Sequence, residues 1–201
     1  MSAVHSVLPQ TPVYETGQRK RFTRAEMDQL LSTGAFEGQR FELIDGDLIE
    51  KLGQNPPHSQ AIRLVSKLLA SFVESDRIQV QLPIDLAIPD GNRNVPEPDI
   101  AVLTELKREF DHRHPRAEEL VLIVEVADTS AALDLSRKAE LYAQAGVPEY
   151  WVLDLNRRML VIHRQTDGTQ YRNTQLHSEN DRVTMKGRSE SVQVSALLPT
   201  A

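Results

Sequence analysis

The sequence predicts a single domain of the α/β class. Apolar runs rich in valine and isoleucine at 99–103 and 120–126 indicate strands, and segments with helical spacing lie before and after them. Helices and strands that alternate along a chain pack around a common core. A chain of 201 residues without an internal repeat is long enough for one such domain. We therefore expect one domain over residues 22–198, preceded by a loose leader over residues 1–21.

The composition is that of a globular protein, with 40% hydrophobic and 26% charged residues. No apolar run approaches the ~20 residues of a membrane-spanning helix, and the N-terminal stretch lacks the apolar core of a signal peptide. We therefore expect a protein that makes no membrane contact. The absence of cysteine excludes disulfide bonds and cysteine metal sites, which is compatible with the cytoplasmic location that we expect. The net charge of −6 argues against a strong nonspecific nucleic-acid binder, although a local basic strip is compatible with a nuclease.

A capped helix and a hairpin open the domain. Thr23 and Glu26 have the spacing of a capping box, in which each side chain accepts a backbone hydrogen bond at the start of a helix. A short helix is therefore expected there. Asp45-Gly46 has the residue types of a tight turn and lies between the strand-like segments 40–44 and 48–51, which predicts a β-hairpin.

The middle of the chain is expected to alternate helix and strand. Apolar residues at helical spacing predict a helix that Ser59 caps and that runs to about Ser75. Strict alternation of apolar residues over 80–88 predicts a half-buried strand. Strands are also expected over 99–103 and 120–126, and the second should be central because it is apolar on both faces.

The remaining elements follow from charge, helical spacing and turn residues. Residues 104–118 are charged and are expected to be part helix and part loop. A helix is predicted over 133–145, ended by Gly146. Segments 150–155 and 159–164 predict a second hairpin, and the rest of the chain should form peripheral strands and turns.

Lys138 falls on what should be the buried side of its helix. On a wheel with about 100° per residue, it lies near the middle of an apolar arc. That arc is formed by Leu135, Ala139, Leu141, Tyr142 and Ala145. The helix can bury this arc only by directing Lys138 at whatever it packs on, and the ammonium then needs an anionic partner. The alternative is a lysine that merely pairs with a core carboxylate or reaches solvent at the sheet edge.

Glu125 interrupts an otherwise apolar strand. Alternation places it on the face shared by Val121 and Ile123, near the carboxyl end of the strand, where open α/β sheets tend to build sites. The next element is the helix that carries Lys138, so the two should be neighbours. Alternatively, Glu125 caps the following loop or only forms a salt bridge with Lys138.

Asp99 and Glu42 are the other acids in strand-like surroundings. Asp99 follows Pro98, which fixes the chain direction and donates no hydrogen bond, so Asp99 should start a strand or sit at a bulge. Glu42 alternates with Phe41 and Leu43 in the first hairpin. Each has a simpler interpretation: Asp99 could be a turn aspartate, and Glu42 could lie on a solvated hairpin face.

Together the four residues suggest one shared site, because buried charges are rare unless they are paired or bind a metal. Mg²⁺ prefers hard oxygen ligands and keeps several waters, so two or three carboxylates suffice. Such an ion lowers the pKa of bound water and neutralises phosphoryl charge, and a nearby lysine can orient that water. We expect Asp99 and Glu125 to hold the metal, Lys138 to activate water, and Glu42 to add a metal contact or an acid for the leaving group.

These residues and their order resemble the PD-(D/E)xK nuclease superfamily. Within it the chain is most similar to the Uma-type (Uma-two) restriction endonucleases. The similarity covers roughly residues 22–164, with weaker support to about 198. It is carried by FELIDGDLIE, PEPDIAVL, LIVEVADTS and DLSRKAELYAQAGVPEYWVLD.

The resemblance implies a restriction-endonuclease-like fold, a mixed central sheet flanked by helices. It implies a magnesium- or manganese-dependent endonuclease that hydrolyses DNA phosphodiester bonds with a metal-activated water. Asp99 and Glu125 correspond to the metal-binding acids, and Glu42 to the acid supplied upstream. Superfamily members often pair to cut both strands, so we expect a homodimer.

The chain departs from the superfamily pattern at one position. The motif lysine should stand two residues after the second acid, where this chain has Ala127. Lys138 is the natural substitute from the neighbouring helix. Catalysis depends on Lys138 taking the role of the motif lysine. The alternative is a nuclease-like module that binds DNA or a protein partner without cutting DNA. A third possibility is a structural salt-bridge core in an unrelated enzyme.

Other polar residues are weaker candidates. Tyr142, one turn beyond Lys138, could hydrogen-bond into the site or be a core aromatic. His58, just before a predicted helix, could contact a phosphate, act as an acid, or be an ordinary loop histidine. His112 and His114 have a chelating spacing without an evident third ligand, so no zinc site is predicted. Candidate contacts to the DNA backbone are Arg63, Lys67, Arg77, Arg93, Lys107, Arg108, Arg113 and Arg116.

Overall fold

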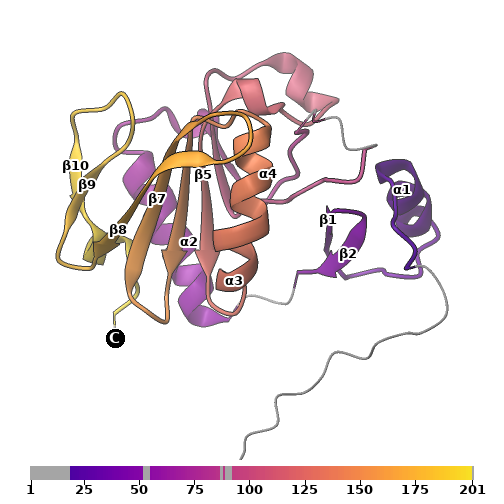
Figure 1. The fold of residues 1–201 in the computed structure, drawn as a ribbon, viewed down its shortest axis with the longest axis horizontal. Coiled ribbons are helices and arrows are strands. Elements are labelled where there is room, and N and C mark those ends of the chain that lie inside the picture. Colours follow the sequence, from indigo (N-terminus) through magenta and orange to yellow (C-terminus); the bar gives the residue numbers. More distant parts are fainter. Residues whose placement is uncertain (1–18, 52–54, 87, 89–91, 201) are drawn as a thin grey trace, which may run out of the picture.

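A six-stranded sheet forms the centre of the protein (Figure 1). The computed structural model describes residues 19–51, 55–86, 88 and 92–200. The strand order is β3-β4-β5-β6-β7-β8. Only β5 and β6 run parallel among these pairs, so the sheet is mixed, as expected. Its strands are β3 (Ile78–Val80), β4 (Ile100–Leu103), β5 (Leu120–Ala127), β6 (Glu149–Asp154), β7 (Met159–Thr166) and β8 (Tyr171–Ser178).

One face of the sheet packs on α2 (Pro56–Leu69). The C-terminal elements cover the same face: β9 (Arg182–Thr184), β10 (Ser191–Gln193) and the 3₁₀ turn η5 (Val194–Leu197). Trp151 of β6 is fully buried in this layer. Leu122, Val124 and Val126 of β5 point to this side.

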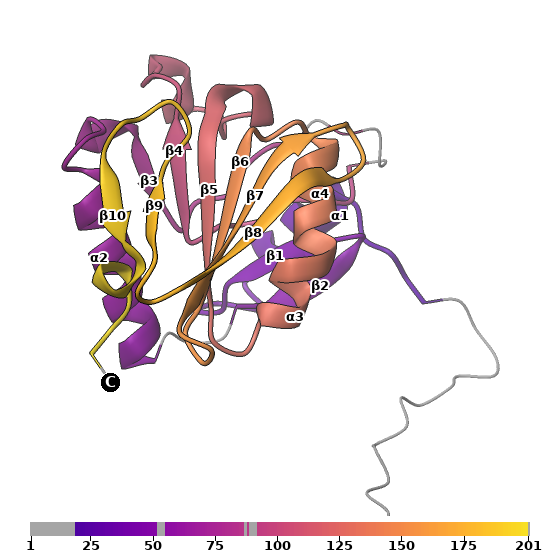
Figure 2. The same cartoon turned by 60° about the vertical axis from the view of Figure 1, so that its left-hand side comes forward.

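The opposite face carries the helix that follows β5 and the N-terminal hairpin (Figure 2). This helix consists of α3 (Ala131–Leu133), a π-helical turn η4 (Asp134–Lys138) and α4 (Ala139–Gln144). The hairpin β1 (Phe41–Ile44) and β2 (Asp47–Glu50) reaches the same core through Ile44. Ile123, Glu125 and Ala127 of β5 therefore face this helix and hairpin.

The capped helix and the hairpin are confirmed. Thr23 caps α1 (Arg24–Ser32), and both hydrogen bonds of the capping box with Glu26 are present. Gly46 in the hairpin turn has φ 81°, a backbone conformation that glycine adopts without a steric penalty. A Cβ there would lie 2.8 Å from Arg21 Cβ and 2.9 Å from the Phe22 carbonyl oxygen. The turn therefore needs glycine both for its dihedral angles and for close approach of the chain.

Two predicted elements differ in the structure. The helix predicted from Ser59 begins earlier, because Asn55 caps it and prolines occupy its first positions, and it ends at Leu69. The strand predicted over 80–88 is wrong beyond Val80, because Gln81 takes a positive φ of 53° and breaks the extended backbone. Ile84 is still fully buried, so the apolar alternation there reflects burial of an irregular segment.

The other predicted elements are present with small shifts. The second hairpin is β6–β7, and β5 is central, as expected. The charged segment 104–118 contains the 3₁₀ turn η2 (Arg108–Asp111) and the start of η3 (Ala117–Glu119), and another such turn, η1 (Ser75–Arg77), precedes β3. Most of the predicted leader, residues 1–18, lies outside the described residues. Within the described chain, no helix has the length and apolar character needed to cross a membrane.

Candidate active site

Lys138 lies at the centre of a buried cluster of carboxylates. Its Nζ is 2.9 Å from Glu42 Oε2, 3.0 Å from Glu125 Oε1 and 3.5 Å from Asp134 Oδ1. The Lys138 side chain is only 3% exposed, and the acids are equally closed to solvent. Three acids from a hairpin, a central strand and a helix therefore share one ammonium.

A π-helical turn presents two of these residues on the same side of the helix. Asp134 and Lys138 are its first and last residues, and both are buried. The Tyr150 hydroxyl donates to the Asp134 carbonyl oxygen at 2.9 Å, which gives this helical carbonyl a side-chain partner. Single π turns within α-helices often occur at functional sites. This one brings a carboxylate and an ammonium to the sheet face that carries Glu125.

Glu125 is buried near the carboxyl end of β5. Its Oε1 accepts hydrogen bonds from Lys138 Nζ and, at 2.9 Å, from the Tyr142 hydroxyl. Burial raises the pKa of Glu125 to about 7; Lys138 opposes this shift and Asp134 adds to it. Tyr142 is fully buried and its pKa is also raised, chiefly by burial, so it serves as a hydrogen-bond donor to the acid.

The cluster combines one ammonium with three acidic side chains. Burial alone would lower the pKa of Lys138, but Glu125, Glu42 and Asp134 more than offset this and raise it, so Lys138 is an ammonium. Burial also raises the pKa of Asp134, and its Oδ1 makes no hydrogen bond. In the part of the chain that the structure describes, one ammonium contacts three acids, and the raised pKa values of Glu125 and Asp134 reflect the cost of ionising all of them without a further positive charge. A further cation would stabilise this group.

Asp99 lies on the same face of the sheet as Glu125. Ile100 pairs with Val124 in the antiparallel β4–β5 register. Continued by one residue, this register places Asp99 opposite Glu125, and opposite residues of antiparallel strands share a face. In addition, Asp99 Oδ2 accepts a hydrogen bond from the Val126 N–H at 2.9 Å, directly after Glu125.

Basic side chains also approach Asp99. His58 Nε2 is 3.3 Å from Asp99 Oδ2, and Lys51 Nζ is 3.9 Å from Oδ1. Burial opposes ionisation of Asp99, but the His58 hydrogen bond and the Lys51 charge outweigh it, so the pKa of Asp99 is lowered. Burial likewise opposes charge on His58, while its hydrogen bond to Asp99 prevails and raises its pKa. Gln81 Nε2 donates to Asp99 Oδ1 at 3.4 Å.

Glu42 connects the hairpin to this site. Its Oε2 lies 2.9 Å from Lys138 Nζ and accepts from the Glu97 N–H at 3.3 Å. The adjacent Leu43 exchanges two backbone hydrogen bonds with Val95, in the segment that leads to Asp99. Glu42 is 3% exposed, so the interpretation as a residue on a solvated hairpin face is wrong.

The structure thus unites some of the predicted residues more closely than others. Glu42, Glu125 and Lys138 form one cluster with Tyr142, while Asp99 is linked to it through β5. Within the described parts of the chain, no three acidic or histidine side chains are grouped so that they could hold a metal ion by themselves. Asp99 and Glu125 as metal ligands, with Glu42 as a further metal contact or an acid, therefore stay a prediction. The oxygen donors of two facing acidic side chains still fit Mg²⁺, which keeps several waters.

Two residues of the site were missed in the sequence. Asp134 lies roughly 40° from Lys138 on the helical wheel, within the apolar arc, so the same wheel could have identified it. Lys51 follows β2 and has no periodic signal, because its proximity to Asp99 depends on how the hairpin packs.

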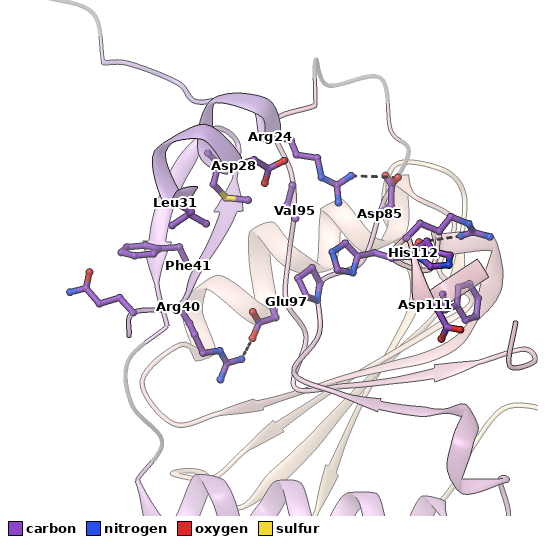
Figure 3. Close-up of a pocket in the computed structure, with 16 residues that line it drawn as sticks. Arg24, Asp28, Leu31, Arg40, Phe41, Asp85, Val95, Glu97, Asp111 and His112 are labelled. Carbon is purple, nitrogen blue, oxygen red and sulfur yellow. Dashed lines mark hydrogen bonds and ion pairs between the residues drawn. The ribbon is translucent and has the colours of Figure 1, made fainter. Parts of the chain in front are cut away.

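A cavity of about 710 Å³ lies beside the site (Figure 3). It is bordered by α1, the hairpin and the segment that contains His112 and His114. Glu97, which pairs with Arg40 at its edge, connects it to Glu42. None of the four acidic and basic residues predicted to be catalytic lines this cavity, so it adjoins the site without containing it.

Several candidate DNA contacts have protein partners instead. Arg77 donates to the Leu103 carbonyl oxygen, and Lys107 and Arg113 both pair with Glu119. The arginine and the lysine at Glu119 lower the pKa of this acid. These three basic side chains stabilise the fold around the 104–119 segment.

The chain matches a protein family in sequence and a solved structure in fold. Residues 24–195 match the Uma2 family, described as "Putative restriction endonuclease". The fold is similar to the crystal structure of a "putative nuclease belonging to DUF820" from Anabaena variabilis, with a TM-score of 0.67 and 15% sequence identity. The match covers 88% of this chain and 97% of that one. No curated protein matches the chain.

Proposed function

The chain belongs to the Uma2 family, and from this premise we propose that it is a metal-dependent endonuclease that hydrolyses DNA phosphodiester bonds with water. One observation supports metal dependence most strongly. The β4–β5 register, continued by one residue, places Asp99 opposite Glu125, beside a cluster in which the Lys138 ammonium contacts three acids. A divalent cation would supply the positive charge that favours ionisation of these acids.

Asp99 and Glu125 are the proposed ligands of Mg²⁺ or Mn²⁺. When bound, the ion would supply a polarised water and neutralise charge on the phosphate. The Val126 N–H and His58 orient Asp99, while Lys138 and Tyr142 orient Glu125. Because the site is assembled by these hydrogen bonds, its carboxylates need little reorganisation to bind a cation.

Lys138 acts in this proposal as a charged donor. Its raised pKa means that it cannot accept a proton from water near neutral pH. It holds Glu125 and Glu42 in place and offsets part of their charge. Glu42 is the assisting acid, positioned by Lys138 and by the Glu97 N–H.

The site is closed to bulk solvent in this conformation. Asp99 is 3% and Glu125 2% exposed. Lys51 and His58 are more open, with side chains 16% and 18% exposed. We therefore place the approach of a DNA phosphate on the side of Lys51 and His58, whose side chains are the more exposed ones at the site.

The proposal is tested by DNA cleavage with matched variants. Plasmid and linear duplex DNA are incubated with Mg²⁺, with Mn²⁺ or with EDTA. We expect cleavage only with metal, and its loss in Asp99→Asn and Glu125→Gln. Asp76→Asn is the control, because Asp76 is an exposed acid in η1.

Circular dichroism and thermal unfolding establish that each variant is folded. Cleavage that persists unchanged in folded Asp99→Asn contradicts the proposed site. A wild-type protein that neither cuts DNA nor binds Mn²⁺ in a calorimetric titration supports the alternative, a nuclease-like module without catalysis.

A further inference from the structure

Two lysines approach the proposed metal ligands in contrasting ways. Lys138 Nζ lies within 3.5 Å of three carboxylates, and its side chain is 3% exposed. It has no free direction in which to meet a substrate. Lys51 Nζ donates to the Glu97 carbonyl oxygen, lies 3.9 Å from Asp99 Oδ1, and belongs to a side chain that is 16% exposed. Lys51 is therefore the lysine at the open side of the site.

The backbone of Lys51 is fixed while its ammonium can be redirected. The Lys51 N–H donates to the Arg40 carbonyl oxygen at 2.8 Å, which extends the hairpin ladder by one residue beyond β2. Its four-carbon stem then carries the ammonium to Asp99. A backbone carbonyl is a neutral acceptor, and hydrogen bonds to a charged phosphate oxygen are stronger. A phosphate beside Asp99 could therefore replace Glu97 as the partner of Lys51.

We propose that Lys51 is a further catalytic residue, whose ammonium binds a non-bridging oxygen of the DNA phosphate that is being cut. This inference rests on the proposed function and specifies which lysine touches the substrate. Lys138 then organises the carboxylates, and Lys51 offsets the charge that grows on the phosphate in the transition state. In this scheme Lys138 and Lys51 each supply part of the role of the motif lysine, whose position is occupied by Ala127.

The first test measures DNA binding without cleavage. A short labelled duplex is titrated with wild type, Lys51→Met and Lys186→Met at several KCl concentrations, with Ca²⁺ in place of Mg²⁺. Lys186 is the matched control, because it is exposed and its backbone N–H binds Glu149 at the start of β6, at the opposite end of the sheet. Each phosphate contact contributes about 0.9 to the slope of log Kd against log salt concentration. We expect the slope to fall by about that amount in Lys51→Met and to stay unchanged in Lys186→Met.

The second test separates binding from chemistry. Single-turnover cleavage is measured with saturating DNA for wild type, Lys51→Met and Lys51→Arg. A contact with the phosphate under attack is strengthened in the transition state, so its loss lowers the rate even at saturation. We expect a decrease of at least about tenfold in Lys51→Met. Partial recovery is expected in Lys51→Arg, which keeps the charge but changes its geometry.

Thermal unfolding distinguishes this role from a structural one. If Lys51 only offsets the charge of Asp99, Lys51→Met lowers the melting temperature and leaves the salt slope and the saturated rate of the folded protein unchanged. That outcome overturns the inference about Lys51. The nuclease proposal would still stand if Asp99→Asn abolishes cleavage. If wild type does not cut DNA, the nuclease proposal and the catalytic role both fail, and the salt slope alone reports whether Lys51 binds phosphate.

Discussion

Lys138 Nζ and Glu125 Oε1 lie 3.0 Å apart in a pair that is almost completely closed to solvent. Glu42 and Asp134 share the same ammonium. This arrangement couples stability to the site, because the hairpin, the central strand and the helix all meet at one buried cation. A substitution at Lys138 therefore acts on the fold as well as on chemistry.

Lys138→Met should destabilise the protein strongly. Removing one member of a buried ion pair typically costs about 3–5 kcal/mol, because the remaining charges lose their partner. Urea unfolding at neutral pH measures this loss. The double variant Lys138→Met/Glu125→Gln should recover part of it, since fewer uncompensated carboxylates remain. A loss below about 1 kcal/mol would show that the cluster is not coupled in this way.

Tyr142→Phe tests the hydrogen bond to Glu125 alone. The ring stays in the core, where it lies edge-on to Tyr150 at a centroid distance of 4.8 Å, and only the 2.9 Å hydrogen bond is lost. Hydrogen bonds to charged groups contribute about 1.5–3 kcal/mol, so a loss in that range is expected in urea unfolding at about pH 9, above the raised pKa of Glu125. We expect a smaller effect on cleavage than that of Glu125→Gln. An unchanged free energy of unfolding would mean that the hydroxyl does not stabilise the ionised acid.

Gly46→Ala should disrupt the attachment of the hairpin. Gly46 and Gly168 both have positive φ, at 81° and 86°, so alanine is strained at either position. Only at Gly46 would the new Cβ also meet backbone and side-chain atoms at under 3.0 Å, whereas Gly168 has open space around it. We expect Gly46→Ala to cost at least about 1 kcal/mol more than Gly168→Ala in thermal unfolding. Equal losses would show that the close contact relaxes freely.

Part of the site was predictable because the periodicity of a helix or strand determines which of its side chains face the core. The wheel correctly directed Lys138 inward, and strand alternation placed Glu125 on the face that the helix covers. The π turn at Asp134–Lys138 departs from the ideal helical angle, yet over so few residues the deviation does not move Lys138 off the buried side. Local pattern therefore sufficed for residues within regular elements.

Other features depend on information that periodicity does not carry. The strand predicted over 80–88 ends at Val80 because of a single positive φ at Gln81, which no apolar pattern reveals. The proximity of Lys51 to Asp99 arises from the packing of a hairpin against a segment that lies far along the chain. Asp134 differs from these two features, because the helical wheel places it within the buried arc.

Stability should decrease in mild acid because of His163. Burial lowers the pKa of His163 to about 4, from 6.5. A histidine with a lowered pKa in the folded state contributes stability above its unfolded pKa, and that stability is lost as pH falls from about 6.5 toward 4. Between pH 7 and 4.5 this contribution should decrease by about 2 kcal/mol.

His163→Gln is the control for this pH dependence. The substitution removes the titrating group on β7 and keeps a polar atom near Thr174 Oγ1, which lies 2.9 Å from His163 Nδ1. The difference in unfolding free energy between wild type and variant isolates His163 from other titrating groups. A difference that does not change with pH would contradict the lowered pKa.

Anomalous scattering from crystals grown with Mn²⁺ tests the metal-dependent site most directly. We predict one strong peak at about 2–2.5 Å from a carboxylate oxygen of both Asp99 and Glu125. The peak should disappear in crystals of Asp99→Asn. No peak between these two carboxylates in wild-type crystals grown with Mn²⁺, or a peak only elsewhere on the protein, would contradict the proposed nuclease site.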